Sequence, residues 1–231
     1  MRKVALITGA ARALGRAIAQ DLASDHEIAL TWRSRAPADP PLAAQLIQAD
    51  LTEAGAPARV IAEVIGRFGR LDVIVNNAGT VVASPLDHFD ANALQTMYGI
   101  NVLAAQALLV AALPHLEPGA AIVNISSVNA ALPPSGAVHY GASKAALEVW
   151  TRGVAQELGP KGIRINAVAP GAVLLDDAPR PPEMVARILE DTALGRMASG
   201  HDIARAVRFL AGPDAAAITG EVLTVSGGYR L

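Results

Sequence analysis

The 231-residue sequence contains no cysteine, which excludes a disulfide framework and a thiolate metal site and fits a reducing compartment. It also contains no cluster of basic residues: the formal net charge is −2 and the arginines are scattered along the chain. This distribution offers no electrostatic footprint for nucleic acid and suits a small or mildly anionic ligand. We therefore expect a cytoplasmic protein that binds a small molecule, without metal and without nucleic acid.

Long uninterrupted apolar segments are missing as well. The amino-terminal MRKVALITGA is basic and then apolar, but Arg12 and Arg16 interrupt it before a signal-peptide core is complete. Residues 91–116 contain no Asp, Glu, Lys or Arg, yet amide side chains and Pro114 divide them and leave VLAAQALLVAAL as the longest block. Twelve such residues suit a buried helix better than a membrane span. We expect no membrane interaction.

Apolar segments of strand length alternate with segments of helical period from end to end. This alternation is typical of a parallel sheet covered on both faces, in the α/β class. No change of composition and no linker divides the chain, so we expect one domain over residues 1–231. The expected strands are 3–8, 27–32, 44–49, 71–77, 120–126, 164–169 and 222–226, and the expected helices are 14–24, 53–68, 91–113, 138–158, 183–191 and 201–211.

Two local patterns refine this order. Only about eleven residues, RSRAPADPPLA, separate the second and third strands, and three of them are proline, so we expect a loop instead of a crossover helix. Ser199 and Asp202 have the spacing of a capping box, which predicts the start of the last helix.

A glycine-containing turn, TGAARALG at 8–15, follows the first strand and opens a helix. In this context backbone N–H groups and a helix N-terminus can bind a pyrophosphate, although a tight turn without a ligand has the same pattern. An acidic residue after the second strand would bind a ribose 2′-hydroxyl, but the sequence there is TWRSR. Arg33, Ser34 and Arg12 could converge on a 2′-phosphate or be merely solvated. The pattern predicts NADP(H) over NAD(H).

Tyr140 and Lys144 lie four positions apart in an Ala-rich helical segment, HYGASKAALEVW, in a chain with only three lysines. This spacing places both on one helical face. An ammonium beside a phenol favours the phenolate, and lowering a tyrosine pKa from about 10 to about 7 requires about 4 kcal/mol. Such a tyrosine could exchange a proton with a substrate oxygen near neutral pH. A surface pair would have the same spacing.

Two further polar residues accompany this pair. Ser127 follows the strand AAIVNIS, at the carboxyl edge where open α/β sheets bind ligands. Asn101 lies on the apolar stripe of the helix before that strand, and a buried carboxamide needs partners. It is either a satisfied core asparagine or a polar side chain that holds a water next to Lys144.

Asp50, which ends the third expected strand, is placed to accept a hydrogen bond from an adenine amino group or to cap a turn.

Together these residues resemble the classical short-chain dehydrogenase/reductase family over essentially the whole chain. The matching elements, in family order, are TGAARALG, ADL at 49–51, NNAG at 76–79, Asn101, Ser127, YGASK at 140–144 and APG at 169–171. The resemblance implies a Rossmann-type, doubly wound sheet of seven parallel strands in a three-layer α/β/α arrangement.

The resemblance also assigns roles to the catalytic residues. It implies that Tyr140 is the general acid/base and that Lys144 binds the nicotinamide ribose and lowers the tyrosine pKa. Ser127 orients the substrate oxygen, and Asn101 positions a relay water. The implied NADP(H) site, with NAD(H) as the alternative cofactor, comprises Gly9, Arg12, Ala13, Leu14, Gly15, Arg33, Ser34, Asp50, Leu51, Asn77, Ala78, Gly79, Tyr140, Lys144, Pro170, Gly171 and Val173.

The sequence departs from the family pattern in two places besides the missing helix after TWRSR. Ala13 replaces the middle glycine of the turn, which tightens the approach to the cofactor. Leu175 stands where the family commonly has a threonine, which leaves the nicotinamide carboxamide to backbone groups around Val173. The segment 172–200, rich in proline and charge, is the expected substrate lid, in which Asp176 and Asp177 either meet a cationic substrate or are solvated.

Several functions and assemblies fit this resemblance. PGAVLLDD and the ending TVSGGYRL resemble the pteridine-reductase branch, whereas Ser127 fits the 3-oxoacyl-thioester reductases. A dinucleotide-sensing regulator on the same fold is a third possibility, but all four polar residues are retained, which favours an enzyme. The helices 91–113 and 138–158 are apolar around much of their circumference, so we expect a homotetramer, a dimer of dimers.

Overall fold

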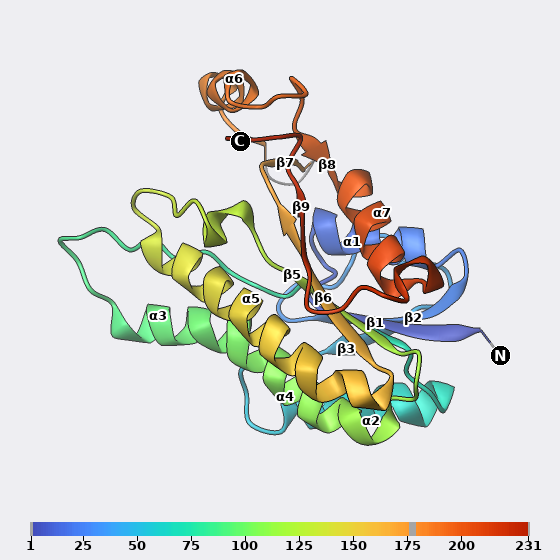
Figure 1. Cartoon of the computed structure of the whole chain (residues 1–231). Coiled ribbons are helices and arrows are strands. Elements are labelled where there is room, and N and C mark those ends of the chain that lie inside the picture. The colour runs from blue at the N-terminus through green and yellow to red at the C-terminus, as the bar shows by residue number, and fades with distance from the viewer. Residues whose placement is uncertain (1, 176–178, 231) are drawn as a thin grey trace.

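Seven parallel strands form one sheet in the computed structural model, which describes residues 2–175 and 179–230. Their spatial order is β3-β2-β1-β4-β5-β6-β9, and every neighbouring pair is parallel (Figure 1). The expected seven-stranded Rossmann-type sheet is therefore confirmed. The strands are β1 (Lys3–Ile7), β2 (His26–Trp32), β3 (Gln45–Gln48), β4 (Val73–Asn76), β5 (Ala121–Ile125), β6 (Arg164–Pro170) and β9 (Val222–Val225).

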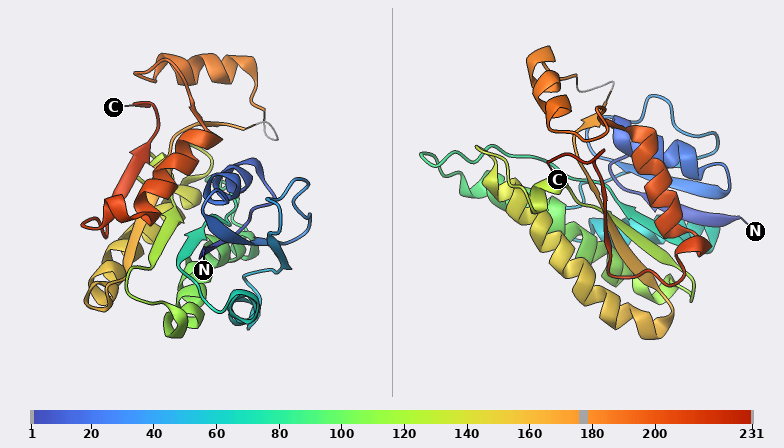
Figure 2. Two further views of the ribbon diagram at one scale, coloured as in Figure 1. Left: turned by 90° about the vertical axis from the view of Figure 1, so that its right-hand side faces the viewer. Right: turned by 45° about the horizontal axis from the view of Figure 1, so that its top comes forward.

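Helices cover both faces of this sheet, as two views at right angles show (Figures 1 and 2). One hydrophobic cluster joins the sheet to α2, α4 and α5, and a second joins it to α1 and α7. Both faces are therefore dry, which explains why the strands are almost continuously apolar. The helices are α1 (Ala13–Leu22), α2 (Ala56–Phe68), α3 (Ala91–Tyr98), α4 (Ala104–Ala112), α5 (Val138–Leu158), α6 (Pro182–Glu190) and α7 (Gly200–Ala211).

The expected helix 91–113 is not a regular α-helix throughout. A π-helical turn, Gly99–Leu103, separates α3 from α4, so the single α-helix that we expected was wrong in this detail. A π-turn contains one extra residue per turn, and such turns occur frequently at functional sites. Asn101 lies at its centre. Among the described residues, only the combined segment Ala91–His115 has the length and hydropathy of a membrane span, and its α4 part packs against the sheet in the core.

Two predictions about connections are confirmed. Residues 33–44 contain no helix between β2 and β3. Ser199 caps α7 through a complete capping box, because its hydroxyl accepts from the Asp202 N–H while the Asp202 carboxylate accepts from the Ser199 N–H. The sequence did not predict a short two-stranded ribbon, β7 (Val173–Leu174) with β8 (Ala198–Ser199), which joins the two ends of the expected lid. Strands of two residues are too short to produce a recognisable period.

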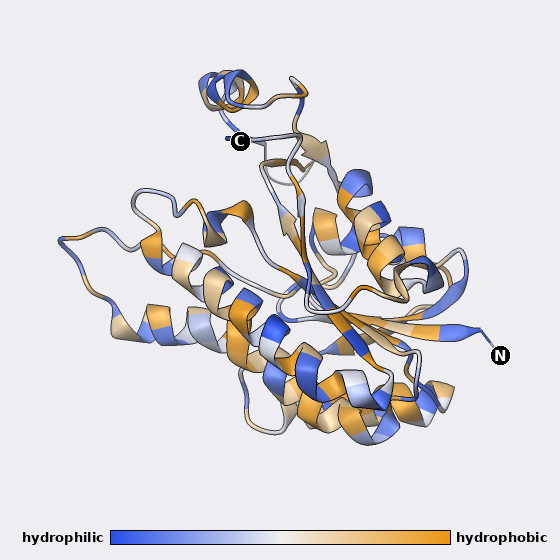
Figure 3. Ribbon diagram, viewed as in Figure 1, coloured by the Kyte–Doolittle hydropathy of each residue, from blue (hydrophilic) through white to orange (hydrophobic). Residues whose placement is uncertain are grey.

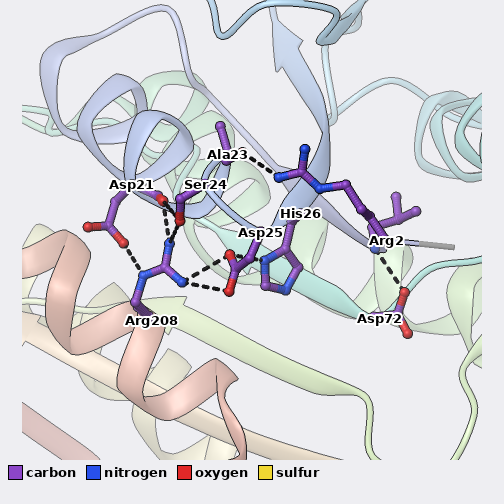
Figure 4. Close-up of polar contacts among 9 residues, drawn as sticks. Arg2, Asp21, Ala23, Ser24, Asp25, His26, Asp72 and Arg208 are labelled. Carbon is purple, nitrogen blue, oxygen red and sulfur yellow. Dashed lines mark hydrogen bonds and ion pairs between the residues drawn. The ribbon is translucent and has the colours of Figure 1, made fainter.

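An ion-pair cluster ties α7 to the first helix (Figure 4). Arg208 on α7 donates to both carboxylate oxygens of Asp25 at 3.0 and 2.9 Å and to the Ser24 hydroxyl at 2.8 Å. It also contacts the side chain and the main-chain carbonyl of Asp21 at the end of α1. The Asp25 carboxylate in turn lies 2.8 Å from Nδ1 of His26, at the start of β2. The carboxyl-terminal part of the chain is thereby attached to the first βα unit.

Candidate active site

The site lies between the neighbouring strands β1 and β4, where the strand order of the sheet reverses. From β1 the strand order proceeds through β2 to β3 on one side, and from β4 through β5 to β6 on the other. In open α/β sheets the crevice outside the carboxyl ends of such strands binds ligands. The predicted motifs TGAARALG and NNAG follow β1 and β4 at this point.

The glycine turn and the NNAG segment contact each other so closely that side chains are excluded. Gly9 has a φ of +66°, and a Cβ on it would lie 2.8 Å from the Cα of Ala78. A Cβ on Gly15 would lie 2.7 Å from Nδ2 of Asn77. The Asn77 amide donates to the main-chain carbonyls of Thr8 and Gly9 at 2.8 and 3.1 Å. The hydrogen bonds from Asn77 thus fix the conformation of the turn, which leads directly into α1.

Two threonines that the sequence analysis missed support this turn. The Thr8 hydroxyl accepts from the main-chain N–H groups of Asn77 and Ala78 at 3.0 and 2.9 Å. The Thr31 hydroxyl on β2 accepts from the Gly9 N–H at 3.2 Å. Both threonines are buried. A hydroxyl among the apolar residues at the end of a buried strand was the available signal.

Arg12, at the N-cap of α1, and Arg33 and Ser34, which follow β2, are all exposed. Nη1 of Arg33 lies 3.6 Å from Oδ2 of Asp50, which stands two residues after the end of β3. Thr52 donates its N–H and its hydroxyl to the other oxygen of Asp50, at 3.0 and 2.7 Å. Burial raises the pKa of Asp50, but the Thr52 bonds and Arg33 outweigh it and hold that pKa below its usual value. Asp50 is therefore a charged residue beside Arg33.

Tyr140 and Lys144 occupy one face of α5, as the four-residue spacing predicts. The side chain of Ser127, which follows β5, lies close enough to the Tyr140 hydroxyl to act on its pKa. Lys144 is buried and donates to the carbonyl of Ile125, the last residue of β5, at 2.7 Å. Its ammonium lies 5.9 Å from the centre of the Tyr140 ring. The end of one strand thus positions both side chains.

The protonation equilibria differ from those expected from the sequence. Burial raises the pKa of Tyr140 above its usual value, although the hydrogen bond with Ser127 acts in the opposite direction. The ammonium of Lys144 lies over the ring and binds the Ile125 carbonyl. The expected lowering of the tyrosine pKa by Lys144 together with a nicotinamide charge stays a prediction. Burial lowers the pKa of Lys144 to about 8, against a raising effect of Glu148.

The carboxamide of Asn101 is fully engaged. Its Oδ1 accepts from the Thr80 N–H at 2.9 Å, and its Nδ2 donates to the Thr80 carbonyl at 2.9 Å and to the Ser143 hydroxyl at 3.0 Å. Ser143 in turn donates to the main-chain carbonyl of Tyr140 at 2.7 Å. Asn101 thus joins the loop after β4 to α5, and its side chain matches the first alternative, a satisfied core asparagine. The predicted relay water stays a prediction.

Gly79 marks the point where these groups converge. A Cβ on Gly79 would lie 3.0 Å from Oδ1 of Asn101 and 3.6 Å from Nζ of Lys144. Gly79 therefore lies against both Asn101 of the π-turn and Lys144 of α5. The sequence analysis missed Ser143, although its position three residues after Tyr140 on a helix places it on the same side.

A directional chain of hydrogen bonds lies beneath the site. The Thr151 hydroxyl donates to the carbonyl of Leu147 at 2.7 Å and accepts from Nδ2 of Asn124 at 2.8 Å. Oδ1 of Asn124 accepts from Nδ2 of Asn76 at 2.8 Å. A carbonyl can only accept, so each side-chain orientation is determined in turn from Leu147 outward. The chain connects β4, β5 and α5 across their buried interface.

The far side of the crevice consists of APG and the expected lid. A Cβ on Gly171 would lie 2.7 Å from the Cβ of Ser226, so the backbone after Pro170 passes directly against the end of β9. The Val173 carbonyl accepts from Arg180 at 2.5 Å. Within residues 172–200, α6 contributes no buried side chain. Asp176 and Asp177 lie outside the described residues.

Comparisons with known proteins agree with this geometry. A family model described as enoyl-(acyl carrier protein) reductase matches residues 9–230. An uncharacterized oxidoreductase of Methylorubrum extorquens is 37% identical, with 99% of this chain and 98% of the relative covered. The 3-oxoacyl-[acyl-carrier-protein] reductase FabG of Staphylococcus aureus is 33% identical, with 100% and 99% covered. A short-chain dehydrogenase from Burkholderia cenocepacia, solved in complex with NADP, has a TM-score of 0.90 at 35% identity, with 98% and 97% covered. The chain belongs to the short-chain dehydrogenase/reductase family of NAD(P)-dependent oxidoreductases.

Proposed function

We propose that this protein is an NADPH-dependent reductase that transfers hydride to a small carbonyl or C=N substrate. The observation that carries the proposal is the arrangement at the end of β5. There the Ser127 side chain acts on the Tyr140 hydroxyl, and the Ile125 carbonyl holds Lys144 one turn further along α5. This arrangement supports roles for Tyr140 as the acid, for Ser127 as the hydroxyl that orients a substrate oxygen and for Lys144 as the cation.

The residues around the glycine turn fit the cofactor. Side chains are absent at Gly9 and Gly15, where the backbone would approach the cofactor. The N-terminus of α1 can stabilise a pyrophosphate, and Arg33 with Ser34 and Arg12 would hold a 2′-phosphate. The NADP in the Burkholderia relative supports this preference. NADPH, when bound, supplies the hydride.

The chain's own residues then handle the proton and the substrate. Tyr140 is protonated at neutral pH, as an ordinary tyrosine is, and burial raises its pKa further, so it can donate its proton to the substrate oxygen as the hydride arrives. Ser127 holds that oxygen through a second hydrogen bond. Lys144 would bind the nicotinamide ribose and stabilise the tyrosinate that forms.

The substrate proposal distinguishes two chemical classes. The FabG relative acts on a 3-oxoacyl thioester, and Ser127 suits that carbonyl chemistry. A dihydropteridine is the alternative, resting on the PGAVLLDD and TVSGGYRL resemblance alone. Oxidation of NADPH with acetoacetyl thioesters and with dihydrobiopterin separates the two, and absence of pterin turnover would remove the second. A dinucleotide-sensing regulator is disfavoured because Asn101, Ser127, Tyr140 and Lys144 are all present.

We also propose that the protein assembles as a homotetramer. Leu103, Val110 and Val149 are exposed by 65%, 61% and 66% on the helices α4 and α5 and the turn that precedes α4. Figure 3 shows hydrophobic residues along these helices as well as in the central strands. Large exposed apolar areas mark interaction surfaces. A cytoplasmic location stays a prediction.

The variant Tyr140→Phe tests the proposed function. It removes the proton donor and keeps the ring, so turnover should fall by about 10²-fold or more. NADPH and NADH titrations, followed by nicotinamide fluorescence, should show tighter NADPH binding that the variant retains. Equal affinity for the two cofactors would contradict the NADPH preference, and a variant with normal turnover would contradict the mechanism.

A further inference from the structure

The end of β5 holds a third polar side chain of α5, which the mechanism above does not use. Ser126 donates its hydroxyl proton to Oε1 of Glu148 at 2.6 Å. Glu148 follows Lys144 by four residues, as Lys144 follows Tyr140, so all three lie on one helical face. Ile125 and Ser126, at the end of β5, therefore contact Lys144 and Glu148 on two neighbouring turns of α5.

The carboxylate of Glu148 is unusually well buried for a charged group. Its side chain is 14% exposed, and Ser126 beside it is buried. The nearest cation recorded on its outer side is Arg152, whose Nη2 lies 3.9 Å from Oε2 and whose side chain is 54% exposed. A long contact with an exposed guanidinium contributes little, because water screens it. The inward hydrogen bond from Ser126 is the closer contact and determines where the carboxylate points.

The group that this carboxylate affects is Lys144. Burial lowers the pKa of Lys144 to about 8, and the negative charge of Glu148 raises it. The other groups recorded around Lys144 carry no charge at neutral pH: Tyr140 on the same helix, Asn101 from the π-turn, Gly79 from the loop after β4 and the Ile125 carbonyl from β5. Glu148 is therefore the anion that compensates the buried ammonium in the described part of the chain.

We propose that Glu148 is a positioning residue of the active site: its carboxylate, fixed by Ser126, keeps the buried Lys144 ammonium charged. The inference rests on the proposed function for its catalytic consequence, since a charged Lys144 matters because it would bind the nicotinamide ribose beside Tyr140. Its electrostatic part concerns only residues of this chain. Ser126 thus acts through Glu148 on the same lysine that its neighbour Ile125 holds directly.

The chain allows a direct test because it contains only three lysines, and the other two, Lys3 and Lys161, are exposed. Protein labelled with ¹³Cε-lysine would give three NMR signals, of which Lys144 is assigned with Lys144→Met. In Glu148→Gln we expect the midpoint of the Lys144 titration to move to lower pH by about one unit. Arg152→Gln should not lower it, because this change removes a cation from the same cluster.

Two variants serve as controls. Glu157→Gln removes an exposed carboxylate from the same helix and should leave the midpoint unchanged. Glu148→Asp retains the charge and should restore most of the shift, and it is also the variant to use if Glu148→Gln fails to fold. A midpoint that Glu148→Gln leaves unchanged, or that Glu157→Gln lowers equally, would overturn the proposal.

Turnover gives the second readout. In Glu148→Gln the rate should be retained below pH 7, and its alkaline decline should begin at a lower pH by the same interval as the NMR midpoint. A uniform loss of rate at every pH would indicate a merely structural role and would contradict the proposal. If the unmodified protein reduces no carbonyl or pterin, the proposed function fails, while the NMR titration still decides whether Glu148 controls the charge of Lys144.

Discussion

Lys144 is the residue whose environment differs most from that of its own kind. It is buried, whereas Lys3 and Lys161 are exposed, and its pKa of about 8 lies below the ordinary value of 10.5. Its charge is therefore lost as the pH rises through about 8, while Tyr140, with a raised pKa, stays protonated. The proton donor and the cation consequently fail at different pH values.

This difference predicts the pH dependence of the reduction. Plotted against pH, kcat/KM for NADPH reports groups of the free enzyme, and it should decline above about pH 8 as Lys144 loses its proton. Stopped-flow or steady-state NADPH oxidation between pH 6 and 10 measures this. Lys144→Arg is the matched control, because arginine stays charged: its rate should be lower but should lack the decline near pH 8. A wild-type profile that is flat to pH 10 would contradict the assignment.

For single residues, the sequence predicted which side chains lie together better than it predicted their pKa values. The shared face of Tyr140 and Lys144 follows from helical spacing, and the place of Ser127 follows from the strand before it. The direction of the Tyr140 pKa shift without a cofactor did not follow, because it depends on how deeply the phenol is buried. Distances of a few ångströms decide such shifts, and no sequence pattern contains them.

Among the elements, α5 shows how one glycine can matter and another not. A Cβ on Gly141 would lie 2.6 Å from the carbonyl of Asn129, in the loop that follows Ser127, whereas a Cβ on Gly153 would meet nothing within 4 Å. Both glycines lie inside the same helix, where alanine is intrinsically favoured by about 0.8–1.0 kcal/mol. Propensity alone predicts the same effect at both positions.

The contacts predict opposite effects. Gly141→Ala should displace the loop that carries Ser127, with a lower melting temperature and a loss of turnover of about tenfold or more, since small misplacements in an active site are costly. Gly153→Ala should be neutral or raise the melting temperature by a few degrees, with turnover unchanged. Differential scanning fluorimetry and NADPH oxidation measure both. Equal behaviour of the two variants would show that the close approach at Gly141 is not limiting.

The elements themselves were largely predictable. All seven sheet strands and the six helical segments appear near their expected positions, because buried parallel strands and amphipathic helices have distinct periods. The π-turn at Gly99–Leu103 was not predicted, since one inserted residue does not disturb an apolar stripe enough to be recognised. The β7–β8 ribbon was missed because two-residue strands have no period.

On the scale of the whole molecule, the strand order and both covered faces follow from the alternation of strands and helices with short connections. The position of α6 did not follow. It contributes no buried side chain, and Figure 1 shows it standing apart from the sheet layers. Its amphipathic sequence predicts a helix. The position of that helix cannot be predicted from the sequence, because no side chain of α6 is buried against another element.

The proposed assembly makes a prediction about solution mass. Light scattering should give a mass four times the 23.7 kDa of one chain. Val149→Asp places a charge on the exposed apolar face of α5 and should reduce that mass, because desolvating an unpaired charge in an interface is unfavourable. Leu42→Asp, at a fully exposed residue of the loop between β2 and β3, is the control and should leave the mass unchanged. A monomer mass for the unmodified protein would refute the assembly.

The attachment of α7 to α1 through Arg208 has a consequence for how the chain is made on the ribosome. Ile18 and Leu22 of α1 belong to the same buried cluster as Ile203, Val207 and Leu210 of α7. Before α7 is translated, the apolar face of α1 that packs against α7 is uncovered. Asp21 and Asp25 also lack their ion-pair partner, Arg208. The apolar surface of α1 is thus covered by a segment that is translated long after it, and a nascent chain stalled before residue 200 would expose that surface to chaperones.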